Sequence, residues 1–418
     1  EITLCTGPRP ERLYASADPA ADVMLSLVRP QVVVFGDDYE ADGSELLVEL
    51  PNVEDGTLRR SDDGTLLVTL HYRDDLVWSD GEPFSIDDAL LGLQMPAPGG
   101  LAPRNHVVGV DPVDEATLIV TLSADAEYPY VPLQPPLPAH ALAAGGDLAA
   151  VADAELLNPS LGPYALAEDG GDALRFERNA AFPGDAGQVA AVSVRFLDSA
   201  AAAPLELQSG QCDVVLDGAL AVEADPALRE ALSSLEVTQY VQPGQVHEQI
   251  VLNTYTGDSG RPAYFADARV RQAVAQAVNR AELAESLWGP AVPVMSSWLP
   301  ESHWANPGAD RLTSYTMNPQ EAARLLDEAG WRDEDGDGVR EYHGAGGVYA
   351  CNRGEWALAE GTPLTPQLII PNGDPLRSRI ATRVAEDLGR VGVRVAVQAF
   401  PVETLYRAGE PLVRRDSD

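Results

Sequence analysis

The chain has 418 residues, of which 45% are hydrophobic and 22% charged, a balance typical of globular proteins. At roughly 100–200 residues per domain, this length favours two or three lobes. Acidic residues number 65 against 28 basic residues, so the formal net charge is −37. A surface that acidic repels phosphate backbones and anionic lipid heads, so we expect no nucleic-acid partner. No run of 18 apolar residues occurs, so no membrane-spanning helix is predicted.

Every basic residue is an arginine, and the sequence contains no lysine. The Schiff-base lysine of a pyridoxal enzyme and the phosphate-loop lysine of an ATPase are therefore excluded. The three cysteines, Cys5, Cys212 and Cys351, lie far apart without the spacing of a metal site. Their odd number leaves at least one without a partner in the chain, and three small buried hydrophobic side chains are the simplest interpretation.

The first predicted element in chain order is a strand at residues 2–4. Alternating apolar residues predict a second strand at 65–72. Ser85, followed three positions on by an aspartate, predicts the start of a helix, and a further strand is predicted at 117–122. We therefore expect residues 41–159 to form a small α+β subdomain.

The next part of the chain has an α/β pattern. A strand at 191–196, an alanine-rich helix and a buried strand at 212–216 predict a βαβ unit. A long extended stretch follows at 237–253. We expect residues 1–40 and 160–250 to form a first α/β lobe.

The last part, residues 251–418, is predicted to form a second α/β lobe. Apolar residues at helical spacing from 270 to 278 predict one helix. Asn318 and Pro319 predict the start of another helix, which Gly330 ends.

A second βαβ crossover is predicted near the end of the chain. A strand at 367–370 is followed by a helix that begins at Asp374-Pro375, and alternating valines predict the next strand at 393–397. The residues alone therefore predict two α/β lobes with an additional α+β subdomain.

The sequence offers no constellation typical of an enzyme. The six histidines occur singly, and neither a Gly-x-Ser-x-Gly elbow nor a dinucleotide-binding glycine motif after a strand is present. Carboxylate pairs are so common in this acidic chain that a glycosidase pair cannot be singled out. We therefore expect a protein that is not an enzyme and requires no cofactor.

One acidic cluster has the composition of a cation site. Asp333, Asp335 and Asp337 occupy alternate positions, and Glu341 is a further candidate ligand. Ca²⁺ prefers such oxygen ligands, and glycine stands where an EF-hand loop turns sharply. The twelfth position, where an EF-hand carries a glutamate, is Gly344, so a full EF-hand is not predicted. A solvated acidic turn and a structural Ca²⁺ site both remain open.

Aromatic residues are the other candidate ligand contacts, because ligand clefts use flat apolar faces with few polar groups. Tyr14, Trp298 and Trp304 lie in irregular segments bordered by prolines. Ordinary packing and ligand contact are both open for these three residues. Trp78 precedes a turn, and for it we expect packing within the small subdomain.

Motifs of one known family occur in order from about residue 1 to 400. The most recognisable is the segment 69–84, which includes Trp78-Ser79-Asp80-Gly81. The others are 137–140, 162–164, 177–179, 207–213, Asn253, 267–273, 279–280 and Gly330-Trp331 with the acidic loop that follows. In this ordered set, the chain resembles the extracytoplasmic solute-binding proteins of the peptide/nickel class, family 5, which serve ABC importers.

The resemblance implies a two-lobed, periplasmic-binding-protein-like α/β fold of type II with an extra α+β subdomain. The lobes would close by hinge motion, around 241–253, on a small solute such as an oligopeptide, which passes to the permease subunits of the importer. It further implies a monomer in the periplasm or at the cell surface, with a lipid anchor through a removed N-terminal segment as one expectation. Asn253, a motif residue, joins Tyr14, Trp298 and Trp304 as a candidate ligand contact.

The sequence departs from the family in one respect. Family members continue well beyond the equivalent of Phe400, so we expect either a fragment or a shortened homologue that lacks the usual C-terminal portion of the second lobe. The aspartate that holds the ligand's amino terminus in peptide binders lies in that portion and is not carried over. Two alternatives remain: a shortened, non-transporting sensor or interaction protein on the same fold, and a secreted hydrolase.

Overall fold

The computed structural model describes most of the chain. The described residues are 1–10, 13, 19–94, 106–126, 128–130, 133–142, 156–185, 187–216, 226–238, 240, 247–254, 262–289, 292–344, 348–351 and 354–406. The chain divides into two compact units, Glu1–Val237 (unit 1) and Thr238–Asp418 (unit 2). By this division residues 238–250, which we expected in the first lobe, belong to unit 2. Among the described residues, no helix is both long and apolar enough to cross a membrane.

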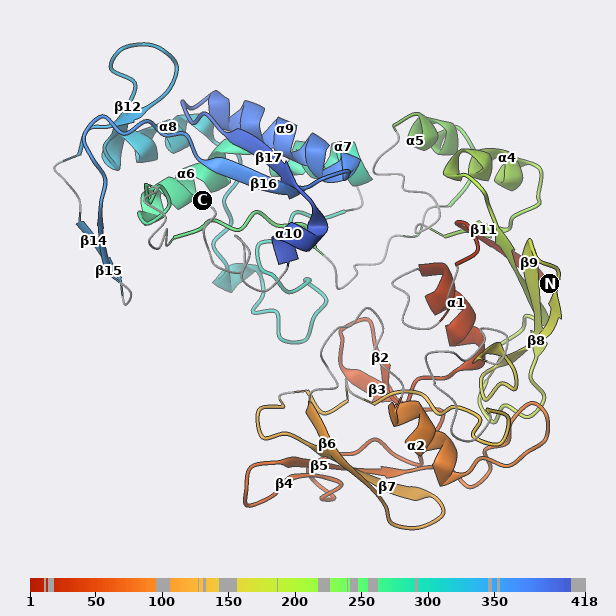
Figure 1. Ribbon diagram of the computed structural model, residues 1–418. Coiled ribbons are helices and arrows are strands. Elements are labelled where there is room, and N and C mark those ends of the chain that lie inside the picture. Colours follow the sequence, from red (N-terminus) through yellow and green to blue (C-terminus); the bar gives the residue numbers. More distant parts are fainter. Residues whose placement is uncertain are drawn as a thin grey trace. The chain divides into compact units, whose positions relative to one another are not determined.

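Unit 1 contains a five-stranded sheet in the order β11-β1-β10-β9-β8 (Figure 1). Its strands are β1 (Ile2–Thr6), β8 (Tyr164–Asp169), β9 (Ala173–Arg178), β10 (Ala191–Phe196) and β11 (Val214–Val215). β1 lies between β10 and β11 and is parallel to both. The 3-10 helix η4 (Ala200–Ala202) and α4 (Ala203–Gln208) connect β10 to β11. The predicted βαβ unit is confirmed, although β11 is short and partly exposed.

Two further helices belong to this part of unit 1. The helix α1 (Pro19–Val28) packs on the sheet, because its Met24 and Val28 are fully buried in one core with Phe176 of β9. The helix α5 (Pro226–Ser233) contacts α4.

A disulfide joins Cys5 of β1 to Cys212, which lies just before β11. Both residues are buried, and their Cα atoms are 5.8 Å apart because β1 and β11 are neighbouring strands. The interpretation of all three cysteines as free, buried side chains is therefore wrong for this pair. Cys351 is the last residue of β14 (Val348–Cys351), and its side chain is outside the described part of the chain.

The small subdomain of unit 1 contains a four-stranded antiparallel sheet in the order β4-β5-β7-β6. The elements of this region are β2 (Val34–Phe35), β3 (Ala41–Gly43), β4 (Leu58–Arg60), β5 (Leu66–His71), α2 (Ile86–Gln94), β6 (Val107–Pro112) and β7 (Thr117–Leu122). Along β5, Leu66, Val68 and Leu70 are buried and the residues between them are less so. Ala89 of α2 lies in the same core. The predicted strands and helix of this region are confirmed.

Unit 2 combines helices with three two-stranded sheets among its described residues. Its described elements are α6 (Ala268–Ala277), α7 (Arg280–Trp288), η6 (Ala309–Arg311), α8 (Pro319–Glu328), β12 (Trp331–Arg332), β13 (Glu341–Tyr342), β14, β15 (Gly354–Ala357), β16 (Gln367–Pro371), α9 (Pro375–Gly389), β17 (Ala396–Phe400) and α10 (Val402–Tyr406). The side chain of Asn318 accepts a hydrogen bond from the Glu321 amide at the start of α8, as predicted. Gly330, with a φ of +90°, follows the end of that helix.

The second βαβ unit is also confirmed, since β16 and β17 are parallel and α9 connects them. Its second strand begins at Ala396 rather than at Val393. The amide of Val393 donates to the carbonyl of Leu388 at the end of α9, and the amides of Arg394 and Ala396 donate to the carbonyls of Leu364 and Pro366, which precede β16. The core of unit 2 includes Trp331 and Leu364, both fully buried.

Candidate functional site

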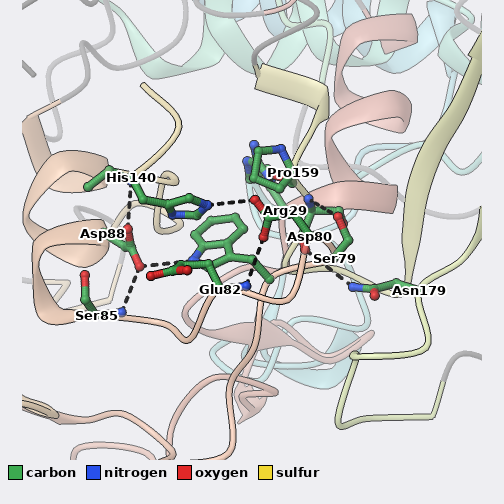
Figure 2. A network of polar contacts seen from close by, with 12 residues as sticks. Arg29, Ser79, Asp80, Glu82, Ser85, Asp88, His140, Pro159 and Asn179 are labelled. Carbon is green, nitrogen blue, oxygen red and sulfur yellow. Dashed lines mark hydrogen bonds and ion pairs between the residues drawn. The ribbon is translucent and has the colours of Figure 1, made fainter. Parts of the chain in front are cut away.

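The family-like segment 69–84 carries a buried polar network in unit 1 (Figure 2). The side chain of Trp78 is fully buried, which confirms the packing role expected for it. Its indole Nε1 donates to Oδ2 of Asp88 at 3.0 Å. The same carboxylate accepts from the Ser85 amide at 2.8 Å and from the Ala139 amide at 2.7 Å. Asp88 therefore holds together the Trp78 turn, the start of α2 and the segment 137–140.

A buried arginine lies beside this network. Arg29, which follows α1, is 2% exposed, and its guanidinium carbon lies 5.2 Å from the centre of the Trp78 ring. Its Nη1 donates to the carbonyl of Pro159 at 2.6 Å, while Nε and Nη2 have no hydrogen-bond partner within the described residues. Burial lowers the pKa of Arg29 to about 9, and the nearby Asp88 carboxylate counteracts that shift.

Hydrogen bonds tie the same turn to the strand-bearing part of unit 1. The amide of Ser79 donates to the carbonyl of Ser160 at 2.8 Å, and the Ser160 amide donates to Oγ of Ser79 at 2.9 Å. Nδ2 of Asn179 donates to the carbonyl of Gly162 at 2.9 Å. His140 contacts Asp80 at 2.9 Å between Nε2 and Oδ2. Four of the family motifs thus meet in one junction, whose role in this structure is to join the subdomain to the larger sheet.

The acidic loop of unit 2 connects the two strands of the β12–β13 hairpin. Trp331 anchors the hairpin, because it is fully buried and its ring lies 5.3 Å from that of Tyr342. One oxygen each of Asp333, Asp335 and Glu341 lies within 4.8 Å of the others. Three hard oxygen donors this close to one another are the kind of ligand set that suits Ca²⁺.

The fourth predicted ligand, Asp337, has other contacts. Its Oδ1 accepts from the Val339 amide at 2.7 Å, and its Oδ2 lies 3.5 Å from Arg394. Gly336 and Gly338 both have positive φ angles, of 77° and 85°, which lets the backbone turn twice within the loop. The structure therefore brings three of the four predicted ligands together, and metal binding itself stays a prediction.

The four predicted ligand-contact residues differ in their surroundings. Trp298 and Trp304 are 69% and 61% exposed, in the irregular segment 292–318 between α7 and α8. Asn253 is half-buried in unit 2, and Tyr14 lies outside the described residues. The ligand contacts of all four stay predictions.

The buried charges of unit 1 were not predicted. The sequence predicts Asp88 only as part of a helix start, and it gives no sign that Arg29 is buried. The one sequence signal was the spacing from Ser85 to Asp88, which places a carboxylate in the first turn of α2.

The two-unit architecture, with its parallel crossovers and added subdomain, is that of the periplasmic-binding-protein-like α/β proteins. Residues 56–411 match the family model described as bacterial extracellular solute-binding proteins, family 5 Middle. Since that match spans most of the chain, the protein belongs to family 5 of the bacterial extracellular solute-binding proteins.

Individual relatives match at low identity. The nickel-binding periplasmic protein of Escherichia coli is 24% identical, over 88% of this chain and 66% of that protein. The oligopeptide-binding protein AppA of Bacillus subtilis is 26% identical, over 38% of this chain and 26% of that protein. The crystal structure of NikA from Brucella suis in complex with Fe(III)-EDTA has a TM-score of 0.67 at 20% identity, covering 98% of this chain and 77% of that one, which shows a shared fold. The chain thus spans no more than two thirds of these curated relatives.

Proposed function

We propose that this chain is the solute-binding receptor of an ABC importer and that it captures a small solute outside the cytoplasm. Membership of family 5, over residues 56–411, is the observation that carries the proposal. The family and the structural neighbours are binding proteins rather than enzymes. The permease subunits of the importer are its proposed partners.

An oligopeptide is the proposed solute. One relative is named an oligopeptide-binding protein, and another is named a nickel-binding protein. The exposed indoles of Trp298 and Trp304 offer flat apolar area of the kind that holds peptide side chains. Hinge closure of the two lobes on the peptide, which the family resemblance implies, is part of this proposal.

The disulfide supports a location outside the cytoplasm. Disulfides persist in oxidising compartments such as the periplasm and the cell surface, and thiols are kept reduced in the cytosol. Cys5 and Cys212 are joined and buried, as expected of a structural bridge.

Thermal unfolding with and without solute tests the proposal. A solute that binds only the folded chain stabilises it by RT ln(1 + [L]/Kd), which is about 2.7 kcal/mol at 100 Kd. We expect mixtures of oligopeptides to raise the melting temperature, and sugars or free nickel to have no effect. The absence of a shift with any peptide mixture would contradict the peptide proposal and favour a sensor or interaction role. Chemical conversion of the peptide would favour a hydrolase.

The acidic loop is a proposed site for structural Ca²⁺. The convergence of Asp333, Asp335 and Glu341 on the β12–β13 hairpin supports it. Calorimetric titration with Ca²⁺ tests the site, and a titration without heat would leave a solvated acidic turn.

A further inference from the structure

The negative charge of the chain is concentrated in unit 1. Residues 1–237 carry 41 acidic and 11 basic residues, whereas residues 238–418 carry 24 and 17. Unit 1 therefore has a formal net charge of −30 and unit 2 one of −7. A potential of this sign raises the local concentration of cationic solutes and repels anionic ones.

Few positive groups in unit 1 offset its carboxylates. Of its 11 arginines, Arg29 is buried beside Trp78 and does not reach the surface. Arg9, Arg73 and Arg195 each form an ion pair with a carboxylate of the same unit. These ion pairs neutralise only a few of the 41 acidic residues, so unit 1 keeps a large negative net charge.

The two exposed tryptophans of unit 2, Trp298 and Trp304, lie on a loop that is stabilised by hydrogen bonds within the same segment. Nδ2 of Asn306 donates to the carbonyls of Leu299 and Pro300, at 3.0 and 2.9 Å. The loop between Trp298 and Trp304 is therefore pinned by its own hydrogen bonds, while both indoles extend into solvent.

Trp298 and Trp304 are the most exposed tryptophans among the side chains that the structure describes. Trp78 and Trp331 are both fully buried, as expected of the side chains that gain most from burial. Trp298 and Trp304 keep most of their surface in water on a hydrogen-bonded loop. Tryptophan has the ring face that attracts cations most strongly, so two such faces are suited to guanidinium or ammonium groups.

The charges of the loop segment agree with that preference. Glu301 and Asp310 are both exposed within residues 292–318, and Arg311 is the one basic residue of that sequence segment besides His303. An anionic solute would therefore find little positive charge there.

On the basis of the receptor function proposed above, we propose that the solute is a cationic oligopeptide and that Trp298 and Trp304 bind its positive side chains. The net negative charge of the chain, −37, raises the rate of encounter with cationic peptides, and the indole faces select guanidinium or ammonium groups at short range.

The test compares two pentapeptide libraries that differ only at two fixed positions, which carry arginine in one and citrulline in the other. Citrulline keeps the shape and most hydrogen-bonding groups of arginine but has no charge. By calorimetry with the full chain in 50 mM NaCl, the arginine library should bind on the order of tenfold more tightly. The difference should shrink in 500 mM NaCl, because salt screens the attraction.

Substitution of the loop gives the second readout. Trp298→Leu and Trp304→Leu should each weaken binding of the arginine library by about two- to fivefold, as loss of an exposed cation–π contact predicts, and affect the citrulline library less. Tyr128→Leu is the matched control, because Tyr128 is an aromatic residue of unit 1 with 64% exposure. Thermal unfolding of each variant checks that it is folded.

The outcomes separate this inference from the receptor function. Equal binding of the two libraries would overturn the preference for cations and leave the receptor function in place. Binding of neither library would contradict the peptide receptor itself. A preference for arginine that both tryptophan variants retain in full would overturn the assignment of the loop.

Discussion

Replacement of Asp88 by alanine tests the buried junction of unit 1 most directly. The substitution removes the acceptor of three hydrogen bonds, from the Trp78 indole and from the amides of Ser85 and Ala139, at 2.7 to 3.0 Å. It also removes the carboxylate that favours the charged form of the buried Arg29.

The expected loss of stability follows from these contacts. Each buried donor left without a partner costs about 1–3 kcal/mol, although relaxation and entry of water reduce the sum. With three donors left without this acceptor, and the buried charge of Arg29 without the nearby carboxylate, we expect Asp88→Ala to cost about 3–5 kcal/mol. With a urea m-value of about 2 kcal/mol/M, the unfolding midpoint of unit 1 should fall by about 2 M.

Hydrogen exchange and urea unfolding measure the effect where it is expected. Trp78 is the one tryptophan in the sequence of unit 1. In Asp88→Ala, hydrogen exchange of backbone amides should accelerate in peptides that cover 66–94 and 137–142. Asp87→Ala is the matched control, because Asp87 is the exposed neighbour in the same turn of α2. A difference below about 0.5 kcal/mol between the two variants would refute the role assigned to the Asp88 carboxylate.

Four other outcomes are expected. Replacing Cys5 and Cys212 together by alanine should lower the melting temperature under non-reducing conditions, since a bridge across a sequence separation of 207 contributes up to about 5 kcal/mol in the chain-entropy model; an unchanged melting temperature would contradict this. If Ca²⁺ binds the acidic loop, Asp335→Ala should abolish the heat of Ca²⁺ titration; heat that persists would place the ion elsewhere. Raising NaCl from 50 to 500 mM should stabilise the wild-type chain, because salt screens repulsion among its carboxylates; thermal unfolding at both salt concentrations decides. Hydrogen bonds from Arg9 lower the pKa of Asp169 to about 2, so the pair's contribution to stability is complete above about pH 4 and is lost as the pH falls towards 2. In Arg9→Gln, the free energy of unfolding should depend less on pH between about 4 and 2 than it does in the wild type. Identical pH profiles of the two proteins would contradict a stabilising role of the Arg9–Asp169 pair.

Local sequence patterns predicted the secondary structure well, because their signals lie within a few residues of each other. The helix starts at Asn318 and Asp374 are examples, since each side chain caps a nearby amide. The end of α9 shows the limit of such patterns. Alternating valines continue from 393 to 397, yet pairing with β16 begins only at Ala396, since Val393 bonds to the end of the helix and Arg394 to Leu364, before β16 starts.

Features that depend on distant parts of the chain were not predictable. The bond between Cys5 and Cys212 requires β1 and β11 to be neighbours, which neither segment indicates by itself. Arg29 resembles any charged residue after a helix, and only the fold places it against Trp78. The side chains of the acidic loop were predicted as a group, but the turn of the backbone directs Asp337 to Val339.

The bridge between Cys5 and Cys212 turns most of unit 1 into a covalent ring. One cut by a protease inside that ring opens it without releasing a fragment, so the nicked protein keeps its mass until a reductant is added. Proteolytic damage to exposed turns would therefore leave the halves of this unit attached and able to re-associate.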